Sequence, residues 1–334
     1  MAKTTITDIA KKLNISTSTV SRALRNHPEV SANTRKLVRQ TARNMNYHPN
    51  IIAQSLQRGH SNIIGVMVPQ VRHVFFAEIM AGISDVMEKA GYSVLICQSN
   101  ETYENEVRNV ETLLQQRIAG LLVSISEQTK QYDHFHQVIN SNVPLVFFDR
   151  TCEKIPASAV TTDDFQPACN LVTYLIKRGY KRIAHLAGYT NLELAKKRLE
   201  GYKAALRNNG ISYDPGLVLQ KGLNEEDGRN GFREIYNRLQ IKPDAIFAVT
   251  DPVAFGAFQE IKKIGLKIPD DIALAGFSNN PTGALIDPPL TTVHQPAYEI
   301  GKTAAELLLD KIINDNTENI KKILPTELII RKTT

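Results

Sequence analysis

Short runs of valine, isoleucine and leucine recur along most of this chain, each separated from the next by about the length of one helix. Runs that are apolar throughout are typical of strands in parallel sheets that helices cover on both faces. The pattern therefore predicts an α/β body from residue 61 onward. Its strands are expected at 63–68, 94–97, 121–125, 145–148, 183–187, 245–249 and 272–277. Ligands of such sheets bind beyond the carboxyl ends of the strands, so the residues after each run are candidates for a binding site.

The first 60 residues carry an excess of positive charge. They contain ten lysines and arginines but only two carboxylates, Asp8 and Glu29, whereas residues 61–334 contain 30 basic and 32 acidic residues. A basic region beside a nearly neutral body suggests a polyanionic partner, most often nucleic acid. A solvated basic face without a partner is the alternative. A chain of 334 residues is long enough for two or three domains, so the basic region can form a domain of its own.

The basic region is expected to form three short helices. The first follows Thr7 as N-cap, the second covers about 17–25 after Ser16, and the third runs from Ser31 to about 46. On the second helix the apolar residues fall on one face, while small hydroxyl residues and one arginine fall on the other. Such a polar face suits a helix that enters the major groove of DNA. An ordinary helix pair that carries this surface by chance is the alternative.

The same region closely resembles the LacI/GalR family of bacterial transcriptional regulators. The resemblance is carried by TDIA at 7–10, ISTSTVSRAL at 15–24, YHPN at 47–50 and AQSL at 53–56. The similarity continues along essentially the whole chain. It implies a transcription factor that dimerises and reads a pseudo-palindromic operator in double-stranded DNA.

The resemblance also assigns DNA contacts to particular residues. The expected major-groove base contacts are Thr17, Ser18 and Arg22. The residues expected to contact or orient on the phosphate backbone are Ser16, Ser21, Ser31, Thr34, Tyr47 and Asn50. Leu56, with Ala53 on the same face, matches a leucine that family members insert into the minor groove to bend the duplex. Packing of Leu56 against the body is the alternative, and Gln57 stands where many relatives have a basic residue.

The body resembles the type I periplasmic-binding-protein fold that this family uses as its effector domain. The implied fold class is an all-α helix-turn-helix domain with a hinge helix, followed by a two-lobed α/β domain that holds an effector between its lobes. The expected effector-binding residues are Phe75, Phe76, Ser124, Asp149, Arg150, Arg198, Asp251 and Ser278. Aspartates and arginines beside aromatic rings suit a sugar. For each residue a structural role in a loop is the alternative, and Ser278 replaces an acidic residue that relatives often carry.

The same family resemblance implies the limits of the domains. Residues 1–49 form the DNA-binding domain, 50–60 the hinge helix or linker, and 61–334 the effector-binding and dimerisation domain. Lobe 1 is expected to contain about 61–161 and 292–324, and lobe 2 about 162–291 and 325–334. Three crossings between lobes would form a hinge, and its closure in a C2 dimer would couple the cleft to DNA. The resemblance places the dimer face around 76–87, with parts of the second lobe as a further candidate.

Other classes of protein have little support in the sequence. Motifs for nucleotide binding or for a nucleophilic serine are absent, so no cofactor and no catalytic residue is expected. Asp133-His134-Phe135-His136 reads as a solvated helix and not as a metal site, and three scattered cysteines read as free thiols. No apolar stretch approaches the roughly 20 residues that span a bilayer. The N-terminus lacks a signal-peptide pattern, so a cytoplasmic protein is expected, associated with the nucleoid when it is bound to DNA.

These observations favour a regulator, most often a repressor, of carbohydrate-related genes that responds to a small molecule such as a sugar. A solute-binding protein for sugar transport is the alternative, and a sugar-processing enzyme is a third. The sequence leaves open the effector, the operator, and whether the effector releases or tightens DNA. The tail at 321–334 looks like a final strand and not a tetramerising helix, which favours a dimer over a tetramer.

Overall fold

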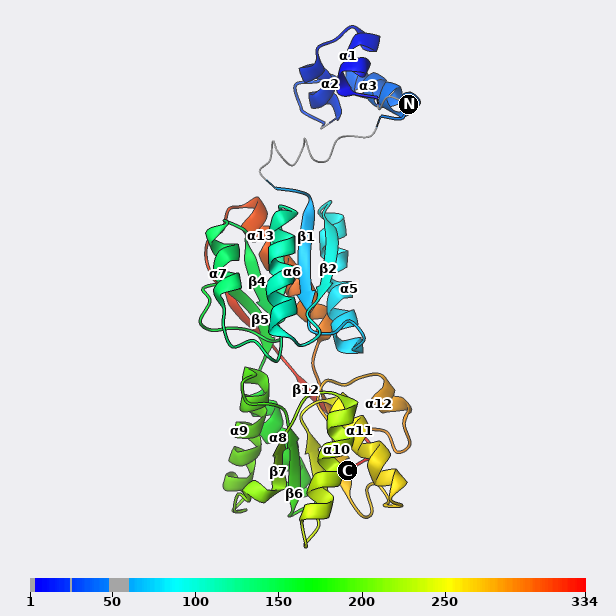
Figure 1. Cartoon of the computed structure of the whole chain (residues 1–334). Coiled ribbons are helices and arrows are strands. Elements are labelled where there is room, and N and C mark those ends of the chain that lie inside the picture. The colour runs from blue at the N-terminus through cyan, green and yellow to red at the C-terminus, as the bar shows by residue number, and fades with distance from the viewer. Residues whose placement is uncertain (1–3, 25, 48–59) are drawn as a thin grey trace. The chain divides into compact units, whose positions relative to one another are not determined.

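The structure is a computed structural model that describes residues 4–24, 26–47 and 60–334 (Figure 1). The chain divides into two compact units, Met1–Ser61 and Asn62–Thr334. Among the described residues no helix is both long and apolar enough to cross a membrane.

The described part of the first unit contains three helices, α1 (Ile6–Leu13), α2 (Thr17–Leu24) and α3 (Ala32–Asn44). Their inward faces form a small core in which Ile9, Val20 and Val38 are fully buried. Because one shared core holds all three helices, the polar face of α2 is left free at the surface.

The helix caps agree with the sequence analysis at two of three positions. Ser16 accepts a hydrogen bond from the backbone N–H of Thr19 at 3.0 Å, and Ser31 accepts one from Thr34 at 3.2 Å. The prediction of Thr7 as the first N-cap was wrong. Thr5 holds that place, because the carboxylate of Asp8 accepts the Thr5 backbone N–H at 2.8 Å and so satisfies the exposed helix start.

The second unit contains two parallel sheets. The first has the order β11-β5-β4-β3-β1-β2, and we call this sheet and its helices lobe 1. Its strands are β1 (Ile63–Val68), β2 (Ser93–Gln98), β3 (Gly120–Val123), β4 (Leu145–Phe148), β5 (Ser158–Thr162) and β11 (Lys321–Leu324). One face packs on α5 (Val74–Lys89) and α13 (Ala297–Ile313), and the other on α6 (Tyr103–Gln115) and α7 (Asp133–Asn140).

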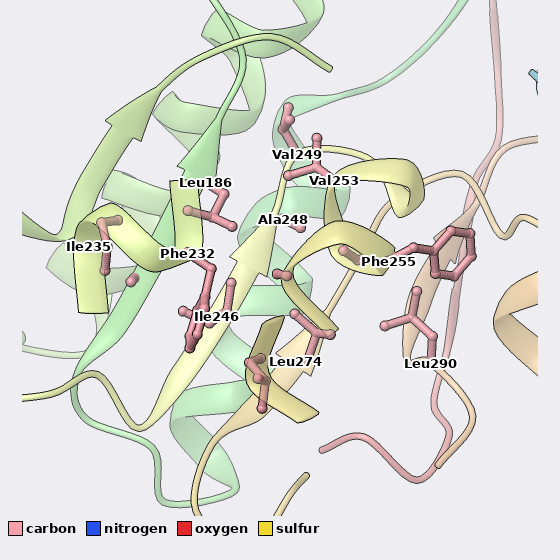
Figure 2. Close-up of a cluster of buried hydrophobic side chains, with 14 of the residues drawn as sticks. Leu186, Phe232, Ile235, Ile246, Ala248, Val249, Val253, Phe255, Leu274 and Leu290 are labelled. Atoms are coloured by element: carbon pink, nitrogen blue, oxygen red, sulfur yellow. The ribbon is translucent and has the colours of Figure 1, made fainter. Parts of the chain in front are cut away.

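The second sheet has the order β7-β6-β8-β9, and with its helices it forms lobe 2. Its strands are β6 (Ile183–Ala187), β7 (Val218–Gln220), β8 (Ala245–Ala248) and β9 (Ala273–Ala275). Helices α8 (Phe165–Lys177) and α9 (Glu193–Asn208) cover one face, and α10 (Glu225–Arg238) and α11 (Asp251–Lys263) cover the other. Figure 2 shows the hydrophobic core between the sheet and helices α10 and α11, where Phe232 from α10 lies beside Ile246 from β8. The short helices η1 (Pro215–Leu217) and α12 (Thr282–Leu285) complete the lobe.

The chain passes between the lobes three times. The first passage follows β5, the second contains β10 (Thr292–His294), and the third leads from β11 to β12 (Glu327–Ile329). Strands β10 and β12 pair in antiparallel register, so two of the passages are bonded to each other. The tail was expected to form one strand, but it forms two in different sheets, because it crosses from lobe 1 to lobe 2 between them.

All seven strands predicted from the apolar runs are present, within a few residues of the expected ends. The strands that the sequence analysis missed are β5, β7 and β10. They are polar or only three residues long, so they lack the continuous apolar run on which the prediction depended.

Helices α10 and α11 approach so closely that a glycine is required between them. A Cβ atom on Gly256 would lie 1.9 Å from the carbonyl oxygen of Glu225. We expect Gly256→Ala to lower the free energy of unfolding by about 1–3 kcal/mol, because the two helix backbones must separate. Gly231→Ala on the facing helix is the matched control, since its Cβ would meet only leucine methyl groups at 3.3 Å. Urea unfolding followed by circular dichroism would contradict this account if both variants behaved alike.

Candidate functional site: a DNA-reading helix and a ligand cleft

The exposed face of α2 carries the residues expected to read DNA bases. Thr17, Ser18 and Arg22 are exposed, while Val20 and Ala23 on the opposite face are fully buried in the helical core. The N-terminal end of a second helix in a helix-turn-helix is the part that reaches base edges. The structure therefore places these three side chains on the exposed surface of the helix.

The residues expected to meet the phosphate backbone also have roles within this unit. Ser16 and Ser31 cap helices, and Ser31 Oγ additionally lies 2.8 Å from Thr34 Oγ1. Ser21 and Tyr47 are half-buried. Asn50, Ala53 and Leu56 lie outside the described residues, as does most of the expected hinge segment at 50–60.

One contact on this surface had no signal in the sequence. The guanidinium of Arg22 donates to the carboxylate of Glu29 at 2.9 Å, and both side chains are more than half exposed. Glu29 lies in the loop between α2 and α3, seven residues further along the chain. The arginine expected to bind a base is thus already held by one of the two carboxylates in the basic region.

A cleft in the second unit is lined by residues of both lobes. It has about 640 Å³ of empty volume, its open mouth included. Its lining residues are Gln70, His73, Phe75, Phe76, Glu101, Glu127, Asp149, Arg150, Leu194, Arg198, Leu223, Asn224, Thr250, Pro252, Ser278 and Gln295. Most of them follow the carboxyl end of a strand, which is where a parallel sheet binds its ligands.

The cleft brings together six of the eight side chains expected from the sequence. Ser124 and Asp251 are not among its lining residues. Asp251 is fully buried, and its carboxylate accepts hydrogen bonds from the Thr292 hydroxyl and the Asn280 backbone N–H, both at 2.6 Å. Burial raises the pKa of Asp251 to about 6. Asp251 therefore bonds α11 to the second crossing. Ser124 is fully buried, and its Oγ has no hydrogen-bond partner among the residues that the structure describes.

Arg198 is the most constrained side chain of the cleft. It is 1% exposed and donates to Asp164 at 2.9 and 2.6 Å and to the Val249 carbonyl oxygen at 2.6 Å. Its guanidinium also lies 3.7 Å from the centre of the Phe277 ring and donates to Gln295 at 3.4 Å. Because Asp164 ends the first crossing and Gln295 lies in the second, Arg198 bonds two of the three passages between the lobes.

Arg150 is held by a second carboxylate. One of its terminal nitrogens donates to both carboxylate oxygens of Glu101, at 3.0 and 2.8 Å, and the side chain is only 7% exposed. The same Glu101 accepts the backbone N–H of Glu127 at 2.8 Å. These hydrogen bonds join the three loops that follow β2, β3 and β4, at the carboxyl ends of the strands.

Two other carboxyl groups of the cleft, those of Asp149 and Glu127, have raised pKa values. Burial raises the pKa of Asp149 to about 6. Burial, and next the charge of Glu101, raise the pKa of Glu127 to about 7. Both groups bind protons more tightly than an exposed carboxyl group does, because burial removes the water that stabilises a charged carboxylate.

The sequence analysis missed Glu101, Glu127 and Gln295 as cleft residues. Glu101 lies three residues after the end of β2, and Glu127 lies four residues after the end of β3. Both could have been predicted, because ligands of parallel sheets bind beyond the carboxyl ends of the strands. Gln295 directly follows β10, which was too short to predict.

The prediction of a solvated helix at Asp133-His134-Phe135-His136 was wrong for one histidine. His134 is buried, and its Nε2 lies 3.0 Å from the buried carboxylate of Glu106, while His136 is exposed. Glu106 also accepts the backbone N–H of Ser126 at 2.7 Å, so this pair supports the loop that carries Glu127. In the described ranges no group of three or more histidine, cysteine, aspartate or glutamate side chains could hold a metal ion. The three cysteines are free thiols.

Comparison with known proteins defines the class to which this fold and cleft belong. Residues 5–50 match the model for bacterial regulatory proteins of the lacI family, and residues 172–334 match a periplasmic binding protein-like domain. The chain is 34% identical over 330 residues to the transcriptional repressor CytR of Escherichia coli K12, covering 99% of this chain and 96% of the relative. The chain belongs to the lacI family and is a DNA-binding transcriptional regulator, not a transport protein.

Solved structures agree with this assignment. The lac repressor dimer bound to operator and the anti-inducer ONPF is 27% identical, with a TM-score of 0.86 over 100% of this chain and 99% of that one. The complex of the transcriptional regulator CelR with cellobiose is 25% identical, with a TM-score of 0.76 over 99% and 100% of the two chains. The family and fold class expected from the sequence are thus confirmed.

The ion pair of Arg198 can be tested by removing the charge of its partner. Asp164→Asn leaves a buried guanidinium without its carboxylate, so we expect the free energy of unfolding to fall by about 3–5 kcal/mol. Asp163→Asn is the matched control, because this neighbouring side chain is exposed and an asparagine can still accept the Phe165 backbone N–H. Equal losses in the two variants on urea unfolding would show that the buried pair has no special role.

Proposed function

We propose that this protein represses transcription by binding a pseudo-palindromic operator as a homodimer, and that a sugar-like effector in the cleft controls this binding. The observation that carries the effector assignment is the cleft itself, where two fixed arginines, several carboxyl groups and the rings of Phe75 and Phe76 converge. Polar groups in fixed positions beside aromatic rings can bind hydroxyl groups while a ring stacks on the apolar face of a sugar. The related regulator CelR, solved with cellobiose, supports a carbohydrate ligand. We infer no catalytic role for the cleft.

DNA binding is assigned to the exposed face of α2. Thr17, Ser18 and Arg22 would contact base edges, and the hydroxyl residues at helix starts would contact phosphates. The lac repressor dimer on its operator supports a dimer that places two such helices on two half-sites. Leu56 and Ala53 would act in the minor groove. The protein would act in the bacterial cytoplasm, on the nucleoid.

The assignment of Arg22 as a base-reading residue predicts a loss of sequence preference. An operator is first selected from a random duplex library with the wild-type protein. We expect Arg22→Ala to weaken operator binding by about 1–3 kcal/mol, because a bidentate contact to guanine is lost. Lys36→Ala is the control, since this exposed lysine of α3 can contribute only charge. If Arg22→Ala weakened operator and random DNA equally, Arg22 would not read a base.

The ion pair between Arg22 and Glu29 predicts how the basic region treats random DNA. Glu29→Gln frees the guanidinium for phosphates, so we expect tighter binding to a random-sequence duplex and a salt dependence steeper by about one phosphate contact. The gain should disappear in the Arg22→Gln background, where the substitution has no guanidinium to release. An equal gain in both backgrounds would mean that Glu29 acts only through the net charge of the region.

A further inference from the structure

We infer that closure of the cleft takes up a proton at Glu127, so that the balance between open and closed lobes depends on pH near neutrality. The proton would then act as a second effector beside the small molecule of the proposed function. Closure itself is independent of that proposal, and only the effect of the proton on operator binding rests on it.

Residue Glu127 is bonded to both lobes through its main chain. Its N–H donates to the carboxylate of Glu101 at 2.8 Å, within lobe 1. Its carbonyl oxygen accepts a hydrogen bond from the side-chain amide of Asn191, which lies in the loop between β6 and α9 of lobe 2. The two lobes therefore touch at this residue, which also lines the cleft.

The loop that carries Glu127 is fixed by a buried carboxylate. Glu106 is fully buried and accepts the Ser126 backbone N–H and the Thr129 hydroxyl, both at 2.7 Å. The Nε2 atom of His134 lies 3.0 Å from the same carboxylate. Because the chain is held on both sides of Glu127, its backbone keeps its place when lobe 2 approaches.

The charged groups of lobe 1 that act on Glu127 form an ion pair with each other. Arg150 donates to both carboxylate oxygens of Glu101, at 3.0 and 2.8 Å. Burial lowers the pKa of His73, which also lines the cleft, so this histidine is neutral near pH 7. The other acid of the lining with a raised pKa, Asp149, titrates lower, at about 6. The group that titrates near pH 7 is therefore Glu127.

Lobe 2 adds negative charge when it closes on this loop. Asp227 lies in the first turn of α10, and its charge acts on Glu127. The Asp227 carboxylate accepts the Asn224 backbone N–H at 3.1 Å, which fixes it at the start of the helix. The same turn carries Glu225 and Glu226, so three acidic side chains offset the positive end of the helix dipole. A charged Glu127 thus meets like charge on closure, whereas a protonated Glu127 does not.

The pKa of Glu127 reflects these surroundings. Burial, and next the charge of Glu101, raise the pKa from 4.5 to about 7, while Arg150 lowers it and Asp227 raises it. Opening the lobes removes Asp227 and the burial that lobe 2 provides, so the pKa falls back toward its ordinary value. The closed state therefore binds the proton more tightly than the open state does. Closure becomes more favourable as the pH falls through about 7, and the gain is complete below the pKa of the open state.

Single-molecule fluorescence energy transfer tests this inference on the full chain without a ligand. Dyes attached through encoded keto amino acids replace two exposed residues, Glu111 on α6 and Arg207 on α9, and report the separation of the lobes. We expect the ratio of closed to open molecules to rise by up to about tenfold from pH 8 to pH 6, because one group changes its pKa on closure. An unchanged ratio would overturn the inference.

Three variants assign the response to Glu127. Glu127→Gln keeps the main-chain bonds to both lobes but cannot titrate, so the ratio should be the same at pH 8 and pH 6. Asp227→Asn keeps an acceptor for the Asn224 N–H and removes only the charge, so we expect a smaller response with its midpoint at lower pH. Glu104→Gln, on the exposed face of α6, is the matched control and should keep the full response. A full response in Glu127→Gln would show that another group takes up the proton.

Operator binding separates this inference from the proposed function. The operator selected from the random library is titrated with the wild-type protein and with Glu127→Gln at pH 6 and pH 8, and comparing the two proteins cancels any titration within the DNA-binding region. We expect the ratio of their affinities to change with pH, by no more than the shift in closure. If the dyes respond but this ratio is constant, proton-linked closure stands and its coupling to DNA is rejected. If the dyes do not respond, the inference is rejected while control by a small molecule stands.

Discussion

The buried guanidinium of Arg198 is the constraint on which the ligand-binding unit depends. A charge that is 1% exposed must be compensated, and the compensation comes from Asp164 after the first crossing and from Gln295 in the second. Gln295 in turn donates to Thr162 at 2.8 Å, at the end of β5. The floor of the cleft is therefore made of the same bonds that join the lobes, and any ligand that contacts Arg198 also acts on the crossings.

Much of this architecture could be predicted from the sequence, because it depends on local patterns. The continuous apolar runs of the central strands predicted the two parallel sheets, and the spacing of hydroxyl and apolar residues predicted α2 with its buried and exposed faces. Phe75, Phe76, Asp149, Arg150, Arg198 and Ser278 were expected in the cleft, and all six line it.

The rest could not be predicted because it depends on contacts between distant segments. The side-chain partners of Arg198 lie 34 and 97 residues away along the chain. The ion pair of Arg22 with Glu29 depends on the loop between two helices. Asp251 was expected in the cleft because it follows a strand, but its carboxylate turns to Thr292 and Asn280. His134 was expected in solvent because no local pattern reveals its pairing with Glu106.

The proposed function requires that an effector bound in the cleft changes the affinity of the DNA-binding helices for the operator. Such coupling is reciprocal: if the effector changes operator affinity by some factor, the operator changes effector affinity by the same factor. The most direct test is to measure the affinity of the effector for the free protein and for the operator-bound protein by calorimetry. We predict that the two affinities differ by the factor that the effector produces in operator binding. Equal affinity for the free and the operator-bound protein would contradict the account.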